Sequence, residues 1–256
     1  MKINGRQALI DRFLPAIEAY DGNPLSRELL IAADGPLSVY YAPVEYINPD
    51  ARLILIGITP GKTQADNSLN AAHASLTKGQ SAQEALIQAK QTAAFSGAMR
   101  PNLIAMLNRI GLDRWLNLNT CDELFGSNAN KLQSTSVLPF PVFLNGENYR
   151  GTPDPIKNSF LRKFIIEFFV PGIKALPGAV YVPLGPVPTM VMAWLISEGH
   201  LEPGRILSGL PHPSGANAER IAYFLGNKPR SLLSSKTDHR KLDSALDRLR
   251  ESVKAL

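Results

Sequence analysis

Arg52-Leu-Ile-Leu-Ile-Gly-Ile-Thr-Pro-Gly61 is the stretch that decides the fold. Its unbroken run of leucine and isoleucine is typical of a strand buried on both faces, and the glycine and proline residues after it indicate a loop at the carboxyl end of that strand. In open α/β sheets ligands bind at this end of the strands. Such a turn is also common without any chemistry, so a second feature has to decide its role.

The rest of the chain alternates between extended and helical patterns. Besides residues 52–57, strands are predicted within 134–144, over 180–185 and over 205–210. Residues 36–48 are predicted to be extended or irregular. Helices are predicted over 6–20, from about 82, over 103–110, 156–169 (ended by Pro171-Gly172), 187–198, from about 216, and over 238–255. This alternation indicates a parallel sheet with helices on both sides. We expect one domain over residues 1–256, with 1–50 as an N-terminal helix and lead-in, 62–94 as an insertion and 238–256 as a C-terminal helix.

Composition narrows the class of protein. Hydrophobic residues make up 45% and charged residues 19% of 256 residues, as in ordinary globular chains. No segment reaches the roughly 18 apolar residues of a membrane span, and the first residues lack a secretory pattern, so a cytoplasmic protein is expected. Cys121 is the only cysteine and the four histidines are scattered, so no metal site is expected. The net charge of +5 suits a polyanionic partner.

The second feature is Pro211-His-Pro-Ser-Gly-Ala-Asn217, which follows the last predicted strand and precedes a predicted helix. Two prolines hold the backbone around His212 and would point its imidazole in a fixed direction. In a doubly wound sheet this loop and Gly57–Gly61 can lie at the same carboxyl edge and form one pocket. The alternative is a histidine in a surface turn.

These residues resemble a known family. Gly57-Ile-Thr-Pro-Gly61 is similar to the first motif of the uracil-DNA glycosylase superfamily, and His212-Pro-Ser-Gly-Ala-Asn217 is similar to its second motif. Between them, residues 95–112 are similar to the segment in which those enzymes carry an aromatic residue, then Pro-Asn, then a helix ending in Gly-Leu. The motif style is nearest to the mismatch-specific uracil/thymine and single-strand-selective branches. The resemblance implies a three-layer α/β/α fold with a central, mostly parallel sheet of about four strands.

The resemblance also implies roles for individual residues. His212 would donate a hydrogen bond to the departing base, and Phe95 would stack on it. Thr59 would orient the attacking water, with Asp66 and Asn67 as the nearest substitutes. Substrate would be held by Gly57, Ile58, Pro60, Gly61, Phe95, Asn145 and Asn148. DNA would be bound by Pro213, Ser214, Gly215, Ala216, Asn217 and Arg220.

Three positions leave alternatives open. Thr59 stands where strongly active relatives have Asp or Asn, and a hydroxyl cannot act as a carboxylate base. Asn145 could read a pyrimidine edge or form an ordinary Asn-Gly turn, with Asn148 as its competitor. Ala216 and Asn217 are small where relatives insert a wedge, which indicates a weak wedge or help from another loop. The segment 62–94 could admit a bulky base or could be a peripheral helical insertion.

The expected function is that of a monofunctional DNA glycosylase that releases uracil or a modified pyrimidine. The expected partner is single- or double-stranded DNA, the product a free base, the state a monomer, and no metal or organic cofactor is required. A first alternative is a bulky substrate such as glucosylated hydroxymethylcytosine in phage DNA, where excision would serve defence. A second is a DNA- or nucleobase-binding module with little catalysis. An unrelated α/β hydrolase is disfavoured because no Gly-x-Ser-x-Gly elbow is present.

Overall fold

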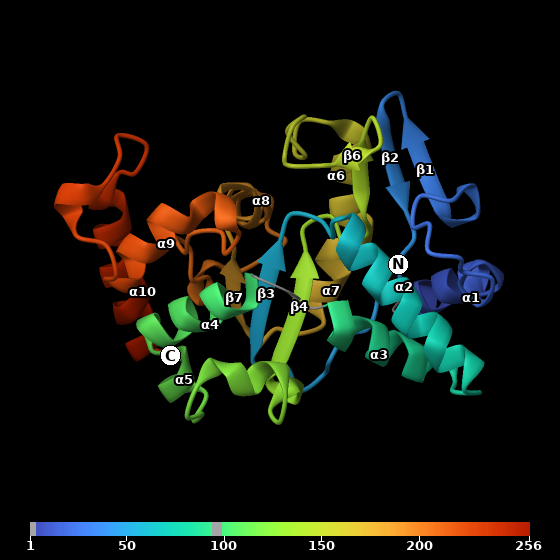
Figure 1. The fold of residues 1–256 in the computed structure, drawn as a ribbon, viewed down its shortest axis with the longest axis horizontal. Coiled ribbons are helices and arrows are strands. Elements are labelled where there is room, and N and C mark those ends of the chain that lie inside the picture. Colours follow the sequence, from blue (N-terminus) through green and yellow to red (C-terminus); the bar gives the residue numbers. More distant parts are fainter. Residues whose placement is uncertain (1–3, 94–98) are drawn as a thin grey trace. The chain divides into compact units, whose positions relative to one another are not determined.

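A computed structural model describes residues 4–93 and 99–256 of the chain (Figure 1). The mixed α/β class predicted from the sequence is confirmed. The chain divides into two compact units. Unit 1 comprises Met1–Pro49, Gly57–Ala94 and Ser134–Pro177, and unit 2 comprises Asp50–Ile56, Phe95–Gln133 and Gly178–Leu256. The single domain expected from the sequence stays a prediction.

A parallel sheet of three strands contains the apolar run of residues 53–57. Its strands, in the order β4-β3-β7, are β3 (Leu53–Gly57), β4 (Leu132–Ser136) and β7 (Val180–Pro183). β3 pairs with β7 in parallel, with Leu53 opposite Val180 and Ile56 opposite Pro183. The first four residues of β3 are buried, which confirms a strand covered on both faces. The sequence is apolar without alternation for that reason.

The fourth strand expected over residues 205–210 is reduced to one bridge. Ile206 pairs with Tyr181 in parallel, and the amide of Leu207 donates to the Tyr181 carbonyl at 2.8 Å. Gly209 then adopts a φ of 122°, outside the extended region of ordinary residues, so the backbone leaves the strand direction before Pro211. The prediction of a strand there is wrong, and the parallel sheet has three strands.

Helices of unit 2 pack with β3 and β7 around an apolar core. They are α4 (Met99–Ile110), α5 (Leu112–Trp115), α8 (Pro186–Ser197), α9 (Ala218–Leu225) and α10 (His239–Lys254). Leu55, Leu107, Val182, Phe224 and Leu249 belong to one buried cluster. Figure 1 shows α9 and α10 beside α4. The ends of α8 and α10 and the start of α9 follow the predicted positions within two residues, because apolar spacing is a local signal. α4 begins at Met99, before the start predicted at residue 103, and α5 was not predicted.

Unit 1 contains an antiparallel sheet that the sequence analysis did not predict. Its strands, in the order β1-β2-β5-β6, are β1 (Leu30–Asp34), β2 (Leu37–Tyr40), β5 (Val142–Leu144) and β6 (Glu147–Asn148). The segment 134–144 had been expected to hold one strand interrupted by prolines. Instead its ends belong to β4 and β5, which lie in different sheets. Pro139 and Pro141 separate them, since proline cannot donate to a ladder.

The helices of unit 1 are α1 (Asn4–Glu18), α2 (Lys62–Thr77), α3 (Ala82–Ala93), α6 (Ser159–Phe164), a π-helical turn (Ile165–Phe169) and α7 (Val170–Lys174). Among these helices, the predicted start of α3 is confirmed and the predicted end of the helix over 156–169 is wrong. The Ser81 hydroxyl and the Glu84 carboxylate form the predicted capping box at the start of α3, since each bonds the backbone amide of the other. The helix predicted over 156–169 does not end at Pro171, because proline in the first turn of α7 needs no amide partner.

Residues 62–93 are helical almost throughout. α2 and α3 lie side by side as a hairpin within unit 1 (Figure 1). α2 escaped prediction because its buried face is built from small residues, including Ala65, Ala72 and Ser75, rather than large apolar ones. Within residues 4–93 and 99–256, no helix has the length and apolar character needed to cross a membrane.

Candidate functional site

The loop after β3 is tied to the segment that leads into β5. The Thr59 hydroxyl donates to the carbonyl of Phe140 at 2.9 Å and accepts from the amide of Val142 at 3.1 Å. Just before Thr59, the carbonyls of Gly57 and Ile58 accept from the backbone amides of Val137 and Leu138 at 3.0 Å each. The hydroxyl proton of Thr59 is therefore committed to a backbone carbonyl. One lone pair remains, which can accept from a water but cannot remove its proton.

Asn148 completes the start of the helix that follows this loop. Its side-chain oxygen Oδ1 accepts from the amide of Lys62 at 2.8 Å, which caps the first turn of α2. A Cβ at Gly61 would lie 3.5 Å from that amide group, so the two residues are in contact. Gly61 in turn donates its amide to Gln64 Oε1 at 3.1 Å. With Oδ1 occupied, the Nδ2 group is the donor that Asn148 offers to a ligand.

Asn145 forms the turn that was its alternative interpretation. Asn145 and Gly146 have φ values of 52° and 78° and join β5 to β6 as a two-residue hairpin turn. The side chain of Asn145 is exposed, and the backbone amide of this residue donates to the Pro36 carbonyl at 2.8 Å. Of the two asparagines, Asn148 is thus the one bonded beside the Gly57–Gly61 loop.

Asp66 and Asn67 lie on α2. Asp66 Oδ1 accepts from the Tyr20 hydroxyl at 2.6 Å and from Asn70 Nδ2 at 2.9 Å. Burial and the Asp66 carboxylate raise the pKa of the Tyr20 hydroxyl, so this bond keeps its proton. Asp66 therefore ties α2 to the residue just beyond α1. Asn67 is half-buried on the same helix.

In unit 2, His212 is half-buried and held in one tautomer. The Ser214 amide, which can only donate, points at His212 Nδ1 from 3.3 Å, and Ser214 Oγ lies 3.0 Å from the same nitrogen. Nδ1 is therefore the acceptor, and the proton of the neutral ring sits on Nε2. Burial lowers the pKa of His212 below its ordinary value of 6.5, so the ring is neutral at pH 7. A neutral imidazole with an Nε2 hydrogen results.

Two contacts that the sequence analysis missed position His212. Asn102 Nδ2 on α4 donates to the Pro213 carbonyl at 3.0 Å. Gly185, after β7, has a φ of 88°, and a Cβ there would lie 3.3 Å from the Cβ of His212. The Pro-Asn pair at 101–102 and the Gly-Pro pair at 185–186 were visible in the sequence. Their partners were not, because they lie far away along the chain.

A series of hydrogen bonds leads away from His212. Asn217 Nδ2 donates to Ser214 Oγ at 3.4 Å, and Arg220 donates to Asn217 Oδ1 at 2.8 Å. The second Arg220 nitrogen donates to the Lys236 carbonyl at 3.2 Å. The expected DNA-binding residues Ser214, Asn217 and Arg220 are thus joined, while Gly215 and Ala216 are exposed in the turn before α9.

The predicted site residues belong to both units. Thr59, Asp66, Asn67, Asn145 and Asn148 lie in unit 1, and His212 with its neighbours lies in unit 2. Phe95, the predicted stacking ring, lies outside the described residues. Within the described ranges no group of three metal-ligating side chains occurs.

Comparisons with known proteins give one clear relative. Over 198 residues the chain is 37% identical to a protein named "Uncharacterized protein YoxB" from Bacillus subtilis (strain 168). The match covers 76% of this chain and 77% of the relative. Neither a protein-family model nor a solved structure matches the chain.

Proposed function

Since the chain belongs to the family of the Bacillus subtilis protein YoxB, whose name states no activity, we propose a function from its own residues. The protein is a monofunctional DNA glycosylase of the uracil-DNA glycosylase superfamily, which hydrolyses the bond between deoxyribose and a flipped-out uracil or modified pyrimidine. We include in the proposal the three-layer α/β/α fold of that superfamily, action as a cytoplasmic monomer, and no cofactor. The observation that carries the proposal is His212, a neutral imidazole whose Nε2 hydrogen is fixed by Ser214.

The chemistry of base release explains why this histidine suits the task. As the glycosidic bond breaks, its electron pair stays on the base, whose carbonyl oxygen gains negative charge, while the sugar becomes an oxocarbenium ion. A hydrogen-bond donor held in place at that oxygen lowers the barrier. Because burial keeps His212 neutral, the Nε2 donor is present at neutral pH without the cost of burying a cation. Water then adds to the sugar carbon and releases a proton.

Thr59 and Asn148 support the same proposal from the first motif. The free lone pair of Thr59 can accept from the attacking water, and Asp66 and Asn67 stay as further candidates for that role. Asn148 Nδ2 can donate to an acceptor on the base edge, in line with its place beside Gly61. Uracil is the first substrate to test, and a bulky modified cytosine is the second.

One observation favours a second function. Both bonds of the Thr59 hydroxyl go to the backbone, so its place in the loop has a structural explanation without any water. A protein with this fold could recognise DNA or a free base and release nothing.

The test is a panel of oligonucleotides carrying uracil, hydroxymethyluracil, xanthine or glucosylated hydroxymethylcytosine, single- and double-stranded, assayed for abasic sites by alkaline cleavage. We expect His212→Gln to lower base release by about 100-fold or more, the size of effect seen when one such donor is removed. His200→Gln, a half-buried histidine elsewhere in unit 2, is the matched control and should act like the wild type. Equal activity in His212→Gln would remove the assignment of that residue. Salt-sensitive DNA binding without any abasic product would favour the binding module.

A further inference from the structure

Three polar residues follow His212 at intervals of three along the chain: Ser214, Asn217 and Arg220. Gly215–Asn217 forms one 3₁₀ turn, and α9 continues directly from it. Because side chains three residues apart lie on the same face of such turns, these three side chains form one polar row. The row begins at the imidazole on which the proposed function depends, and all of it lies in unit 2.

The direction of each hydrogen bond in the polar row is set at its far end. The guanidinium of Arg220 can only donate, so the Asn217 atom that it meets at 2.8 Å is the acceptor Oδ1. The side-chain amide of Asn217 therefore turns its donor Nδ2 toward Ser214 Oγ, 3.4 Å away. Among the described residues, the other partner of this hydroxyl is His212 Nδ1 at 3.0 Å. The Ser214 oxygen accepts from Asn217, and its proton points to the imidazole.

The proton of Ser214 opposes a proton on His212 Nδ1. Both the hydroxyl and the backbone amide of Ser214 converge on that nitrogen, from 3.0 and 3.3 Å. If the Asn217 amide were reversed, its oxygen would accept the Ser214 proton, and Ser214 Oγ would offer a lone pair to a hydrogen on Nδ1. The orientation of Asn217 thus decides whether the hydroxyl supports the Nε2–H tautomer or the opposite one.

The other side of the guanidinium is held by the segment before α10. A second nitrogen of Arg220 donates to the Lys236 carbonyl at 3.2 Å. Glu219 fixes the chain on both sides of Lys236. Its carboxylate accepts from the amide and hydroxyl of Ser234 at 3.1 and 2.6 Å and from the Thr237 hydroxyl at 2.5 Å. The carbonyl that receives Arg220 is therefore itself held in place.

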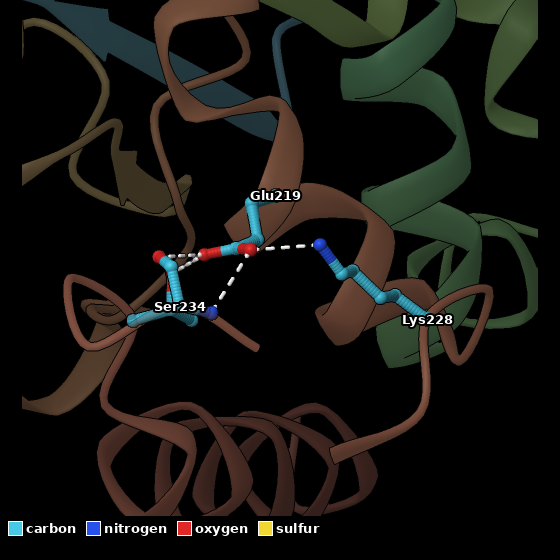
Figure 2. A network of polar contacts seen from close by, with 4 residues as sticks. Glu219, Lys228 and Ser234 are labelled. Atoms are coloured by element: carbon cyan, nitrogen blue, oxygen red, sulfur yellow. Dashed lines mark hydrogen bonds and ion pairs between the residues drawn. The ribbon is translucent and has the colours of Figure 1, made fainter. Parts of the chain in front are cut away.

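Glu219 keeps its charge in this arrangement. Lys228 Nζ donates to the carboxylate at 2.7 Å, and Figure 2 shows Lys228 and Ser234 converging on Glu219 from opposite sides. The hydrogen bond from Lys228 and those from the two hydroxyl groups hold the pKa of Glu219 well below its usual range. The carboxylate stays ionised at neutral pH, so it holds the segment that anchors Arg220 under the conditions in which the protein works.

We propose that Asn217 and Arg220 are positioning residues, which fix the direction of the Ser214 hydroxyl and, through it, the tautomer of His212. For base release this inference rests on the proposed function, whereas the tautomer is a property of the free protein. The resemblance implied DNA binding for both residues. Arg220 has further N–H groups besides the two bonds described, so binding of a DNA phosphate is the competing role.

The tautomer can be measured from the NMR chemical shifts of the two ring nitrogens of His212, which differ between a protonated and an unprotonated nitrogen. Asn217→Asp keeps the shape of the side chain but has no donor, so its carboxylate should accept the Ser214 proton. Arg220→Met frees the Asn217 amide to reverse and adds no negative charge. In both variants we expect the Nδ1 shift to move toward that of a protonated nitrogen at pH 8, and in Arg220→Lys we expect the wild-type shifts to return. Arg240→Met, at an exposed arginine of α10, is the matched control.

The rate of base release gives the second measurement. Arg220→Met should lower the single-turnover rate at saturating protein by about tenfold, a usual effect of losing a group that orients a functional one. Arg220→Lys should recover most of that rate, because its ammonium can still donate to Asn217 Oδ1. A phosphate contact would instead change the affinity for DNA and its salt dependence, with the rate at saturation unchanged.

The outcomes separate the positioning role from the enzyme. If His212 keeps its wild-type nitrogen shifts in both Asn217→Asp and Arg220→Met, the positioning role is refuted, whether or not bases are released. If Arg220→Met weakens DNA binding and leaves His212 unchanged, Arg220 binds phosphate and the positioning role is again refuted. If the shifts move as expected but no oligonucleotide of the panel loses a base, the positioning role stands and the glycosylase assignment is refuted.

Discussion

Glu45 gives the sharpest quantitative prediction about the stability of unit 1. Glu45 is 8% exposed as a residue and its two carboxyl oxygens are buried, in the segment after β2. Burial raises the pKa of Glu45 to about 7, although the Tyr41 hydroxyl and the Lys90 ammonium act to lower it. Lys90 reaches this segment from α3 and donates to the Val44 carbonyl at 2.9 Å. The folded chain therefore keeps a proton on Glu45 at pH values where the unfolded chain has lost it.

The sign and size of the effect follow from this difference. Between the ordinary pKa of 4.5 and about 7, the folded state binds more protons than the unfolded state, so the free energy of unfolding falls as pH rises. Each pH unit of that interval costs about 1.4 kcal/mol, which gives a loss of about 3 kcal/mol by pH 8. Glu45→Gln has no proton to lose and should escape this cost.

The assay is urea unfolding of the wild type and Glu45→Gln at pH 4.5 and pH 8. We expect the stability of Glu45→Gln relative to the wild type to rise by about 3 kcal/mol between the two pH values. Because both chains contain the same histidines, the contribution of histidine titration to stability cancels in this difference. Glu28→Gln, at an exposed position of unit 1, is the matched control and should follow the wild type. Parallel profiles for Glu45→Gln and the wild type would refute the reasoning.

The remaining predictions concern the two motif loops. Thr59→Val should destabilise the protein by about 2 kcal/mol in urea unfolding, because the Phe140 carbonyl and the Val142 amide lose their partner. Thr59→Ser keeps the hydroxyl and should cost less; equal losses in both variants would contradict this role. Gly185→Ala should cost at least about 1 kcal/mol, since alanine is strained at a φ of 88° and its Cβ would press on His212. An unchanged His212 imidazole signal in NMR would exclude that contact. Because burial lowers the pKa of His212, the midpoint of its NMR titration should lie below 6.5. Base release should stay constant as the pH falls to that midpoint and should decline below it. A midpoint above 6.5 would be inconsistent with a neutral donor.

Local patterns were enough to predict much of the fold. β3 and β7 were predicted from short apolar runs, and α10 was predicted from its amphipathic spacing. These signals come from residues that are close together in the sequence, so they do not depend on how the rest of the chain folds. α2 was missed because its buried face is made mostly of small residues, and the antiparallel sheet was missed because β2 pairs with β5, which lies far along the chain and leaves no local pattern.

The candidate site divides in the same way. The glycine and proline punctuation at 57–61 and the prolines around His212 identified both loops from sequence alone. The choice between Asn145 and Asn148 required the structure, because an Asn-Gly turn and a ligand-binding asparagine share the same local sequence.

By itself the sequence determined that Gly57–Gly61 closes a buried strand and that His212 stands on a rigid turn before a helix, because backbone preferences of glycine, proline and β-branched residues act locally. Tertiary structure alone decided what those residues can do. The proton of Thr59 is directed to Phe140 and that of His212 to Nε2 by groups distant in the chain or folded back on it. The hydrogen bonds of Thr59 and the burial that keeps His212 neutral arise only when separate segments meet, and they set the chemistry of the two loops.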